Sequence, residues 1–337
     1  MNAAACPIPC NLCGSVDVEE LSALDRDGRP LRTTICRACG LVWSNPRPGE
    51  DEVRRYYSRE YRMDYKGIAT PSLRHVARSG RGAMNRCRDL APFLKPGDRV
   101  LDAGAGGGEM VYALRRLDFD AMGLEPDERY ARHARETLGV PVETGFVQDR
   151  SFPSGSFDVI TMYHSLEHVE DPVGILTTLH GWLSEGGRLL VEVPNVEARC
   201  IHPRHRFHFA HFYNFNRATL EAAGRRAGLE PVRTSTSPDG GNLITVFMAS
   251  GATVASGSTV ASGATVASGL SRTPQALPGN YERVSQIVRG HTAASYYLSA
   301  APYAGPLGRL RSFLKDRAAA RGRATAREVL DGLIAHS

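Results

Sequence analysis

A short apolar strand that runs directly into a glycine-rich turn is the feature that most constrains the fold of this chain. The segment Arg99–Gly108 reads RVLDAGAGGG, and a run with apolar residues at helical spacing follows it at Met110, Val111, Leu114 and Leu117. Strand, glycine turn and helix in this order are typical of the nucleotide-binding half of an α/β fold. The glycines allow a ligand to approach the backbone where a Cβ atom would collide with it.

The segments that follow alternate between strand and helix patterns. A second strand ends at Glu125, 23 residues after Asp102, where a carboxylate is placed to accept hydrogen bonds from ribose hydroxyls. Further patterns predict a helix over 127–138 and strands over 140–143, 157–162 and 188–193. This alternation predicts an α/β fold with a doubly wound, mostly parallel sheet.

Four of the seven cysteines form two Cys-x-x-Cys pairs with a hairpin signal between them. Cys10 and Cys13 are separated by 22 residues from Cys36 and Cys39, and Asp27-Gly28 predicts a turn between the pairs. Paired thiolates followed by glycine are typical of a tetrahedral zinc site. Residues 1–45 are therefore predicted to form a zinc ribbon, whose four thiolates close the coordination shell and make the ion structural.

The remaining segments have simpler patterns. Residues 46–96 are predicted to be a helical connector, and residues 270–337 to form two basic helices. The connector's tyrosines at 56, 57 and 61 are predicted to pack against neighbouring residues, with a wall of the active site as the alternative. Residues 250–269 repeat a six-residue unit of small uncharged residues, which favours a low-complexity linker. The basic face of these helices is predicted either to contact solvent or to form a dimer contact, so a homodimer is an alternative to a monomer.

Composition places the chain among ordinary globular proteins. Hydrophobic residues make up 42% and charged residues 23%, and the net charge of +5 is too small to argue for nucleic acid. No apolar run is long enough to span a membrane, and the N-terminus lacks the pattern of a secretory signal. We therefore expect a cytoplasmic protein without a membrane partner.

The motif order resembles that of class I S-adenosylmethionine-dependent methyltransferases. The resemblance is carried by residues 100–108, 145–158, 164–172 and 183–195, and it runs from 97 to 249. It implies a Rossmann-like seven-stranded sheet ending in antiparallel strands near 229–233 and 242–248. The ribbon also resembles the N-terminal segment of a subgroup that includes sugar and other small-molecule methyltransferases.

The resemblance also implies how the cofactor binds. Asp102, Gly104 and Gly106 would contact the methionine end and Glu125 the ribose, with Tyr163 close to the methylsulfonium group. Phe146 stands where the family often has an acid, so adenine recognition would rest on the backbone of Val147, with Asp149 as a second candidate. Independently of the resemblance, Asp102 and Glu109 disfavour a pyrophosphate at the helix N-terminus and suit a cationic ligand.

Histidines are concentrated after the fourth and fifth strands. His164, Glu167 and His168 follow one strand, and the histidines at 202, 205, 208 and 211 follow the other. His168 or His208 is predicted to act as a general base or to clamp the acceptor. Alternatively, His164, Glu167, His168 and one distal histidine bind a divalent metal, a spacing similar to that of small-RNA 2′-O-methyltransferases and ubiquinone-pathway O-methyltransferases. A third reading is that Glu167 and His168 only fix the loop.

The predicted function is transfer of a methyl group from S-adenosylmethionine to oxygen on a small polar acceptor, such as a sugar or a secondary metabolite. One alternative is a metal-assisted RNA 2′-O-methyltransferase, which the ribbon and the basic C-terminal helices would favour. The other is a non-catalytic binding protein on a methyltransferase scaffold, motivated by Phe146.

Overall fold

The structure is a computed structural model that describes residues 8–47, 71–249 and 276–335. The tyrosines at 56, 57 and 61 and the repeat at 250–269 lie outside these residues.

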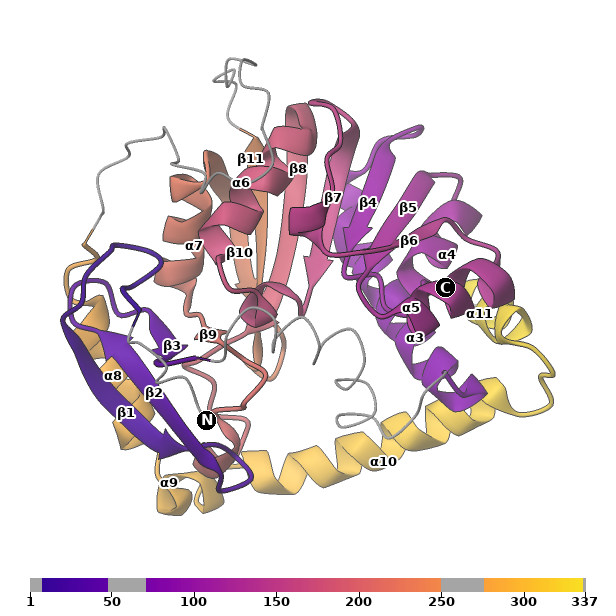
Figure 1. Cartoon of the computed structure of the whole chain (residues 1–337). Coiled ribbons are helices and arrows are strands. Elements are labelled where there is room, and N and C mark those ends of the chain that lie inside the picture. Colours follow the sequence, from indigo (N-terminus) through magenta and orange to yellow (C-terminus); the bar gives the residue numbers. More distant parts are fainter. Residues whose placement is uncertain (1–7, 48–70, 250–275, 336–337) are drawn as a thin grey trace, which may run out of the picture.

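A seven-stranded sheet in the order β10-β11-β8-β7-β4-β5-β6 forms the centre of the molecule (Figure 1). Its strands are β4 Arg99–Ala103, β5 Asp120–Glu125, β6 Val142–Thr144, β7 Phe157–Tyr163, β8 Leu183–Pro194, β10 Leu229–Thr236 and β11 Asn242–Ala249. Strands β4 to β8 pair in parallel, whereas β11 pairs antiparallel with β8 and β10. The predicted α/β class and the antiparallel terminal strands are confirmed.

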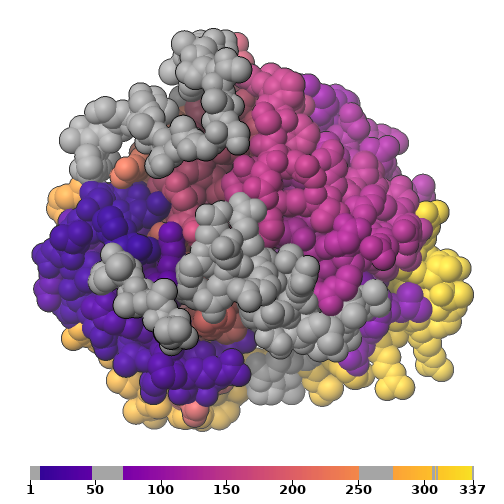
Figure 2. Space-filling view, viewed as in Figure 1, coloured from indigo at the N-terminus to yellow at the C-terminus, as the bar shows by residue number. Residues whose placement is uncertain are grey.

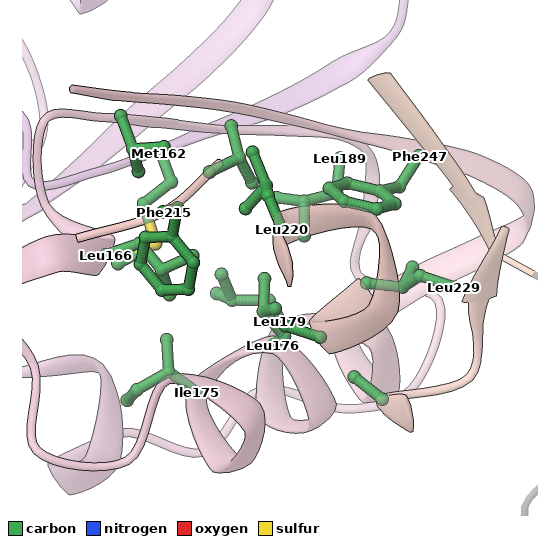
Figure 3. Packing of buried hydrophobic residues seen from close by; sticks show 14 of the residues in the cluster. Met162, Leu166, Ile175, Leu176, Leu179, Leu189, Phe215, Leu220, Leu229 and Phe247 are labelled. Atoms are coloured by element: carbon green, nitrogen blue, oxygen red, sulfur yellow. The ribbon is translucent and has the colours of Figure 1, made fainter. Parts of the chain in front are cut away.

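Helices cover both faces of this sheet. They are α3 Leu73–Leu90, α4 Glu109–Arg116, α5 Glu128–Arg132 with a π-helical turn His133–Leu138, α6 Pro172–Trp182 and α7 Arg217–Arg226. One core lies under α3 and α4, and another lies under α6 and α7. Figure 3 shows the second core, in which Leu176 and Leu179 of α6 point towards Leu220 of α7 and Leu189 of β8.

The ribbon, residues 8–47, contains β1 Val18–Leu24, β2 Pro30–Cys36 and β3 Val42–Ser44. The predicted hairpin is present, since β1 and β2 pair antiparallel around a turn at Gly28. The sequence did not indicate its fourth strand: β9, Tyr213–Asn214, comes from the loop after β8 and pairs with β3. Trp43 and the four cysteines belong to the same buried core as Leu101 and Ile160 of the large sheet. The ribbon is thus built into the main fold.

The C-terminal segment forms four helices instead of the two expected: α8 Asn280–Gly290, α9 Ala293–Tyr297, α10 Ala301–Ala320 and α11 Ala326–Ile334. The chain breaks where Thr292 and Thr325 cap new helices through their hydroxyl groups. Figure 1 shows α10 running along one edge of the molecule, from the side of the ribbon to α11. Arg81 of α3 pairs with the buried Asp316 of α10, so one part of this basic helix packs on the main fold.

Figure 2 shows the ribbon in indigo at one side of the main fold, with the yellow C-terminal helices along its lower and opposite edges. Among the described helices, none has the length and apolar character that crossing a membrane requires.

Candidate active site

A cavity of about 1080 Å³ lies at the carboxyl ends of β4, β5, β7 and β8. This is the edge at which open α/β sheets bind ligands. Its volume exceeds the 300–1,000 Å³ typical of a site for one small molecule. Its lining includes every residue that the sequence assigned to the cofactor, namely Asp102, Gly104, Gly106, Glu125, Val147 and Tyr163.

The glycine turn lines this cavity. Gly104 has φ +91°, in the left-handed region, and a Cβ atom on it would overlap the hydroxyl oxygen of Ser165. Ser165 belongs to the loop after β7, so the glycine allows the first turn and the histidine-bearing loop to lie in contact.

Two buried carboxylates face the cavity from adjacent strands. Asp102, 4% exposed, accepts a hydrogen bond from Thr161 at 2.8 Å, and burial raises the pKa of Asp102 to about 6. Glu125, 3% exposed, accepts from the backbone nitrogens of Gly106 at 2.7 Å and Asp127 at 3.0 Å. Both carboxylates are held in fixed positions and bring negative charge to the glycine turn, which suits a cationic ligand.

Val147 is the buried first residue of a 3-10 turn at the far end of the cavity. Phe146, which precedes it, packs against the hydrophobic core and also lines the cavity. An apolar ring and a backbone segment therefore stand where the family often has an acid.

Arg86 and Glu192 are two cavity residues that the sequence did not single out. The guanidinium carbon of Arg86 lies 4.1 Å from the centre of the Tyr163 ring, and its Nε lies 3.3 Å from Glu192 Oε2. The buried Tyr163 hydroxyl makes no hydrogen bond within the described residues, and burial holds the pKa of this phenol far above its usual range. No local motif marks Arg86, because only the packing of α3 against the sheet brings it to Tyr163.

Glu167, His168 and His211 come together at this edge of the sheet and are called here the Glu-His-His cluster. One ligand atom of each lies within 4.8 Å of those of the other two. The Nδ1 of His168 is 2.7 Å from the carbonyl oxygen of Ala210. Because a carbonyl can only accept, Nδ1 carries the proton in the neutral ring, which leaves Nε2 with a lone pair 3.7 Å from Glu167 Oε1. A hydrogen bond from one ring nitrogen to a backbone carbonyl, as Nδ1 makes here, is typical of metal-binding histidines.

Glu167 is a charged side chain almost entirely removed from water, with 2% exposure. Neither carboxylate oxygen forms a hydrogen bond within the described residues at ordinary distance. Burial alone would raise the pKa of Glu167, but the neighbouring His168 and His164 outweigh it and lower the pKa to about 2. A buried, ionised carboxylate with unused lone pairs is suited to hold a cation or a polarised hydroxyl.

His164 lines the same cavity and lies between Glu192 and Glu167. Its Nε2 lies 2.9 Å from Glu192 Oε1, and its Nδ1 lies 3.5 Å from Glu167 Oε1. Burial opposes protonation of this ring, but the two carboxylates outweigh it and raise the pKa of His164 to about 9. Its backbone has φ +50°, which is uncommon for a residue with a side chain. His164 therefore is placed to orient Glu167 and Glu192.

Of the two histidines, His211 lines the cavity and belongs to the cluster, whereas His208 does neither. The Nδ1 of His208 accepts a hydrogen bond from Ala210 N at 3.2 Å, and its ring centre is 5.2 Å from that of His211. Burial lowers the pKa of His208 to about 4 and that of His211 to about 3. His211 belonged to the distal group in the sequence, but no spacing rule distinguished it from His208.

The four ribbon cysteines form a second cluster, and all are buried. Cys10 Sγ is 3.5 Å from Cys39 Sγ, and Cys13 Sγ is 3.5 Å from Cys36 Sγ. A tetrahedral zinc site with Zn–S bonds of about 2.3 Å has S···S edges of about 3.8 Å. The two distances are close to this value, and all four sulfur atoms lie within 4.8 Å of one another.

Comparisons with known proteins agree with this fold. Residues 74–234 match the family described as "Methyltransferase domain". The ubiquinone biosynthesis O-methyltransferase of Xanthomonas campestris is 38% identical over 106 residues, which are 30% of this chain and 44% of that protein. Phosphoethanolamine N-methyltransferase 1 of Arabidopsis thaliana is 31% identical over 104 residues, 29% of this chain and 21% of that protein. The chain thus spans less than two thirds of these relatives.

Among solved structures, magnesium protoporphyrin IX methyltransferase from Synechocystis with bound SAH is 18% identical and has a TM-score of 0.47. The match covers 60% of this chain and 100% of that one. The match over residues 74–234 thus identifies a methyltransferase domain in this chain, and the mostly parallel seven-stranded sheet has the class I fold.

Proposed function

We propose that this protein transfers a methyl group from S-adenosylmethionine to a hydroxyl oxygen of a small polar acceptor. The observation that carries the proposal is the Glu-His-His cluster, which lies in the same cavity as Asp102 and Glu125. A hydroxyl must lose its proton to attack a methyl group, whereas a neutral amine need not, so an activating centre favours oxygen as the acceptor atom.

In this assignment Asp102 and the glycine turn bind the methionine end of the cofactor and Glu125 its ribose. Arg86 lies over the Tyr163 ring, which in this assignment is close to the methylsulfonium group. The C–O bond forms as the C–S bond breaks, the electron pair of that bond stays on sulfur as a neutral thioether, and the hydroxyl proton is released to water. The residues supply in-line positioning of the two reactants.

A divalent cation fits the Glu-His-His cluster, because a buried carboxylate with unused lone pairs and a tautomer-fixed imidazole converge there. When bound, the ion would lower the pKa of an acceptor hydroxyl. His164 stays outside the ligand set, since its Nε2 is bonded to Glu192. The proposed acceptor is a sugar or a secondary metabolite.

We also propose that Cys10, Cys13, Cys36 and Cys39 hold a structural zinc ion. The fit of the four sulfur atoms to a tetrahedron supports this assignment.

The test is incubation of the zinc-loaded protein with methyl-labelled S-adenosylmethionine and fractionated cell extract, with and without EDTA. We expect label in a small-molecule fraction, its loss in EDTA at constant ribbon zinc content, and recovery with Mn²⁺. The Glu167→Gln and His211→Ala variants should lose at least 100-fold in rate, whereas exposed His205→Ala on the same loop should retain wild-type activity.

The alternatives give different outcomes. Label in RNA would replace the small-molecule acceptor with a nucleic acid. Undiminished turnover in EDTA would eliminate the cation and leave His168 as general base. Absence of S-adenosylmethionine binding in calorimetry would overturn the enzymatic assignment.

A further inference from the structure

The ribbon pairs with the chain immediately after His211. Val42 and Trp43 of β3 lie opposite Asn214 and Tyr213 of β9 in antiparallel register. The Ser44 nitrogen also donates to the carbonyl of Phe212 at 2.9 Å. Backbone hydrogen bonds from the ribbon therefore fix the segment that presents His211.

Arg47, which follows β3, connects the ribbon to the second loop of the cluster. Its Nη1 donates to the carbonyl of Glu170 at 2.6 Å and to the Tyr213 hydroxyl at 2.8 Å. The same Tyr213 hydroxyl donates to the Glu170 carbonyl at 3.1 Å. Glu170 follows His168 by two residues, so this junction joins the loop of Glu167 and His168 to the loop of His211.

The first cysteine pair contacts the same loop directly. Asn11 lies between Cys10 and Cys13, and its Nδ2 donates to Asp171 Oδ1 at 2.8 Å. Its Oδ1 accepts from the backbone nitrogen of Val173 at 3.2 Å. Asp171 is the N-cap of α6, so the conformation of this cysteine pair is transmitted to the end of the Glu167–His168 loop.

We propose that the ribbon is a positioning element of the active centre. Through Arg47 and Asn11 it fixes Glu167 and His168 relative to His211, although no ribbon residue belongs to the cluster. The role of the cluster rests on the proposed function, whereas the connection between the two loops rests on the contacts alone. Residues that orient ligands in this way typically change metal affinity by 10–100-fold when they are removed.

The test uses the full zinc-loaded chain and the Arg47→Ala variant. We expect Mn²⁺ affinity, measured by electron paramagnetic resonance, to fall about 10–100-fold. Hydrogen exchange should become faster in peptides covering 164–171 and 207–214 and stay unchanged over 99–125. Zinc content should remain at one ion per chain. Arg47→Lys should keep most of the wild-type Mn²⁺ affinity and exchange protection. A single nitrogen of Arg47 makes both bonds, and an ammonium group can replace it.

The matched control is Arg37→Ala, another ribbon arginine, which pairs with Glu19 and stacks on Tyr281 away from the cluster. It should leave Mn²⁺ affinity and exchange unchanged. If Arg47→Ala does not fold, Tyr213→Phe is the second variant, because it removes only the shared hydroxyl. It should lower Mn²⁺ affinity and speed exchange in the two loops, but by less than Arg47→Ala.

Wild-type exchange and Mn²⁺ affinity in a folded Arg47 or Tyr213 variant would overturn the proposal. If the wild-type protein binds no Mn²⁺, the cation of the proposed function fails, while the exchange rates of the two loops still decide whether the ribbon positions them.

Discussion

His168 donates its Nδ1 proton to the backbone carbonyl of Ala210 at 2.7 Å, and this bond joins two loops that are 42 residues apart in sequence. It fixes both the ring orientation and the tautomer of His168. The loop after β7 and the loop after β8 are therefore held together at the centre of the cluster by the bond and at its edge by the ribbon.

Replacing Cys39 by serine should remove the zinc ion and destabilise the whole molecule, because the ribbon shares its core with the large sheet. Structural zinc contributes roughly 10 kcal/mol or more to small zinc domains. We expect zinc content to fall below one ion per chain and the melting temperature to drop by more than about 10 °C. Cys200→Ser, at a half-buried thiol outside the cluster, should change neither quantity.

The pH dependence of S-adenosylmethionine binding should report the charge of Asp102. Burial raises the pKa of Asp102 to about 6, so its carboxylate is protonated below that pH and ionised above it. Affinity should rise as the pH increases through 6 and then level off. Asp102→Asn should bind roughly 10–100-fold more weakly at pH 7.5 and show no such step, as titration calorimetry can measure.

Thr161→Val is the companion variant. It removes the hydroxyl that donates to Asp102, so the pKa of Asp102 should rise further and the step in affinity should move to higher pH. A step that persists unchanged in Asp102→Asn would show that another group titrates.

Stability should depend on pH through His164. Its pKa is raised to about 9 in the folded protein, against an ordinary value near 6.5, because Glu167 and Glu192 outweigh its burial. The ion pairs thus stabilise the fold fully below pH 6.5, and this contribution is lost as the pH rises through 9. With a side chain that is 38% exposed, the loss is about 1 kcal/mol after allowance for screening.

The His164→Asn variant should abolish this slope in urea unfolding between pH 6.5 and 9. Asparagine tolerates the positive φ of position 164, so the backbone should be retained. An equal slope in the variant and the wild type would assign the pH dependence to other groups.

Two glycine substitutions separate backbone strain from steric overlap. Gly97 and Gly104 both have positive φ, but nothing lies within 4 Å of a Cβ on Gly97, whereas a Cβ on Gly104 would overlap Ser165. Gly97→Ala should cost about 1 kcal/mol of unfolding free energy. Gly104→Ala should cost more and also weaken S-adenosylmethionine binding. Equal costs would show that Ser165 moves aside.

Much of the fold is predictable from local patterns. The strand and glycine turn at 99–108 and the two cysteine pairs lie in short segments whose geometry follows from their own residues. The C-terminal helices were harder to predict, because the hydroxyl caps at Thr292 and Thr325 divide what reads as two continuous helical patterns.

The candidate site also has features that local sequence predicts and others that only the folded chain sets. The sequence determined that acidic residues lie at the carboxyl ends of β4 and β5 and that histidines follow β7 and β8. These residues lie along one edge because parallel strands place their carboxyl ends there. Only the tertiary structure decided that His211, and not His208, faces Glu167, and that Arg86 covers Tyr163. The pairing of β3 with β9 also required the folded chain, since its partners are 170 and 172 residues apart and neither strand carries a local signal for the other. Long-range packing, which no window of sequence contains, sets these contacts.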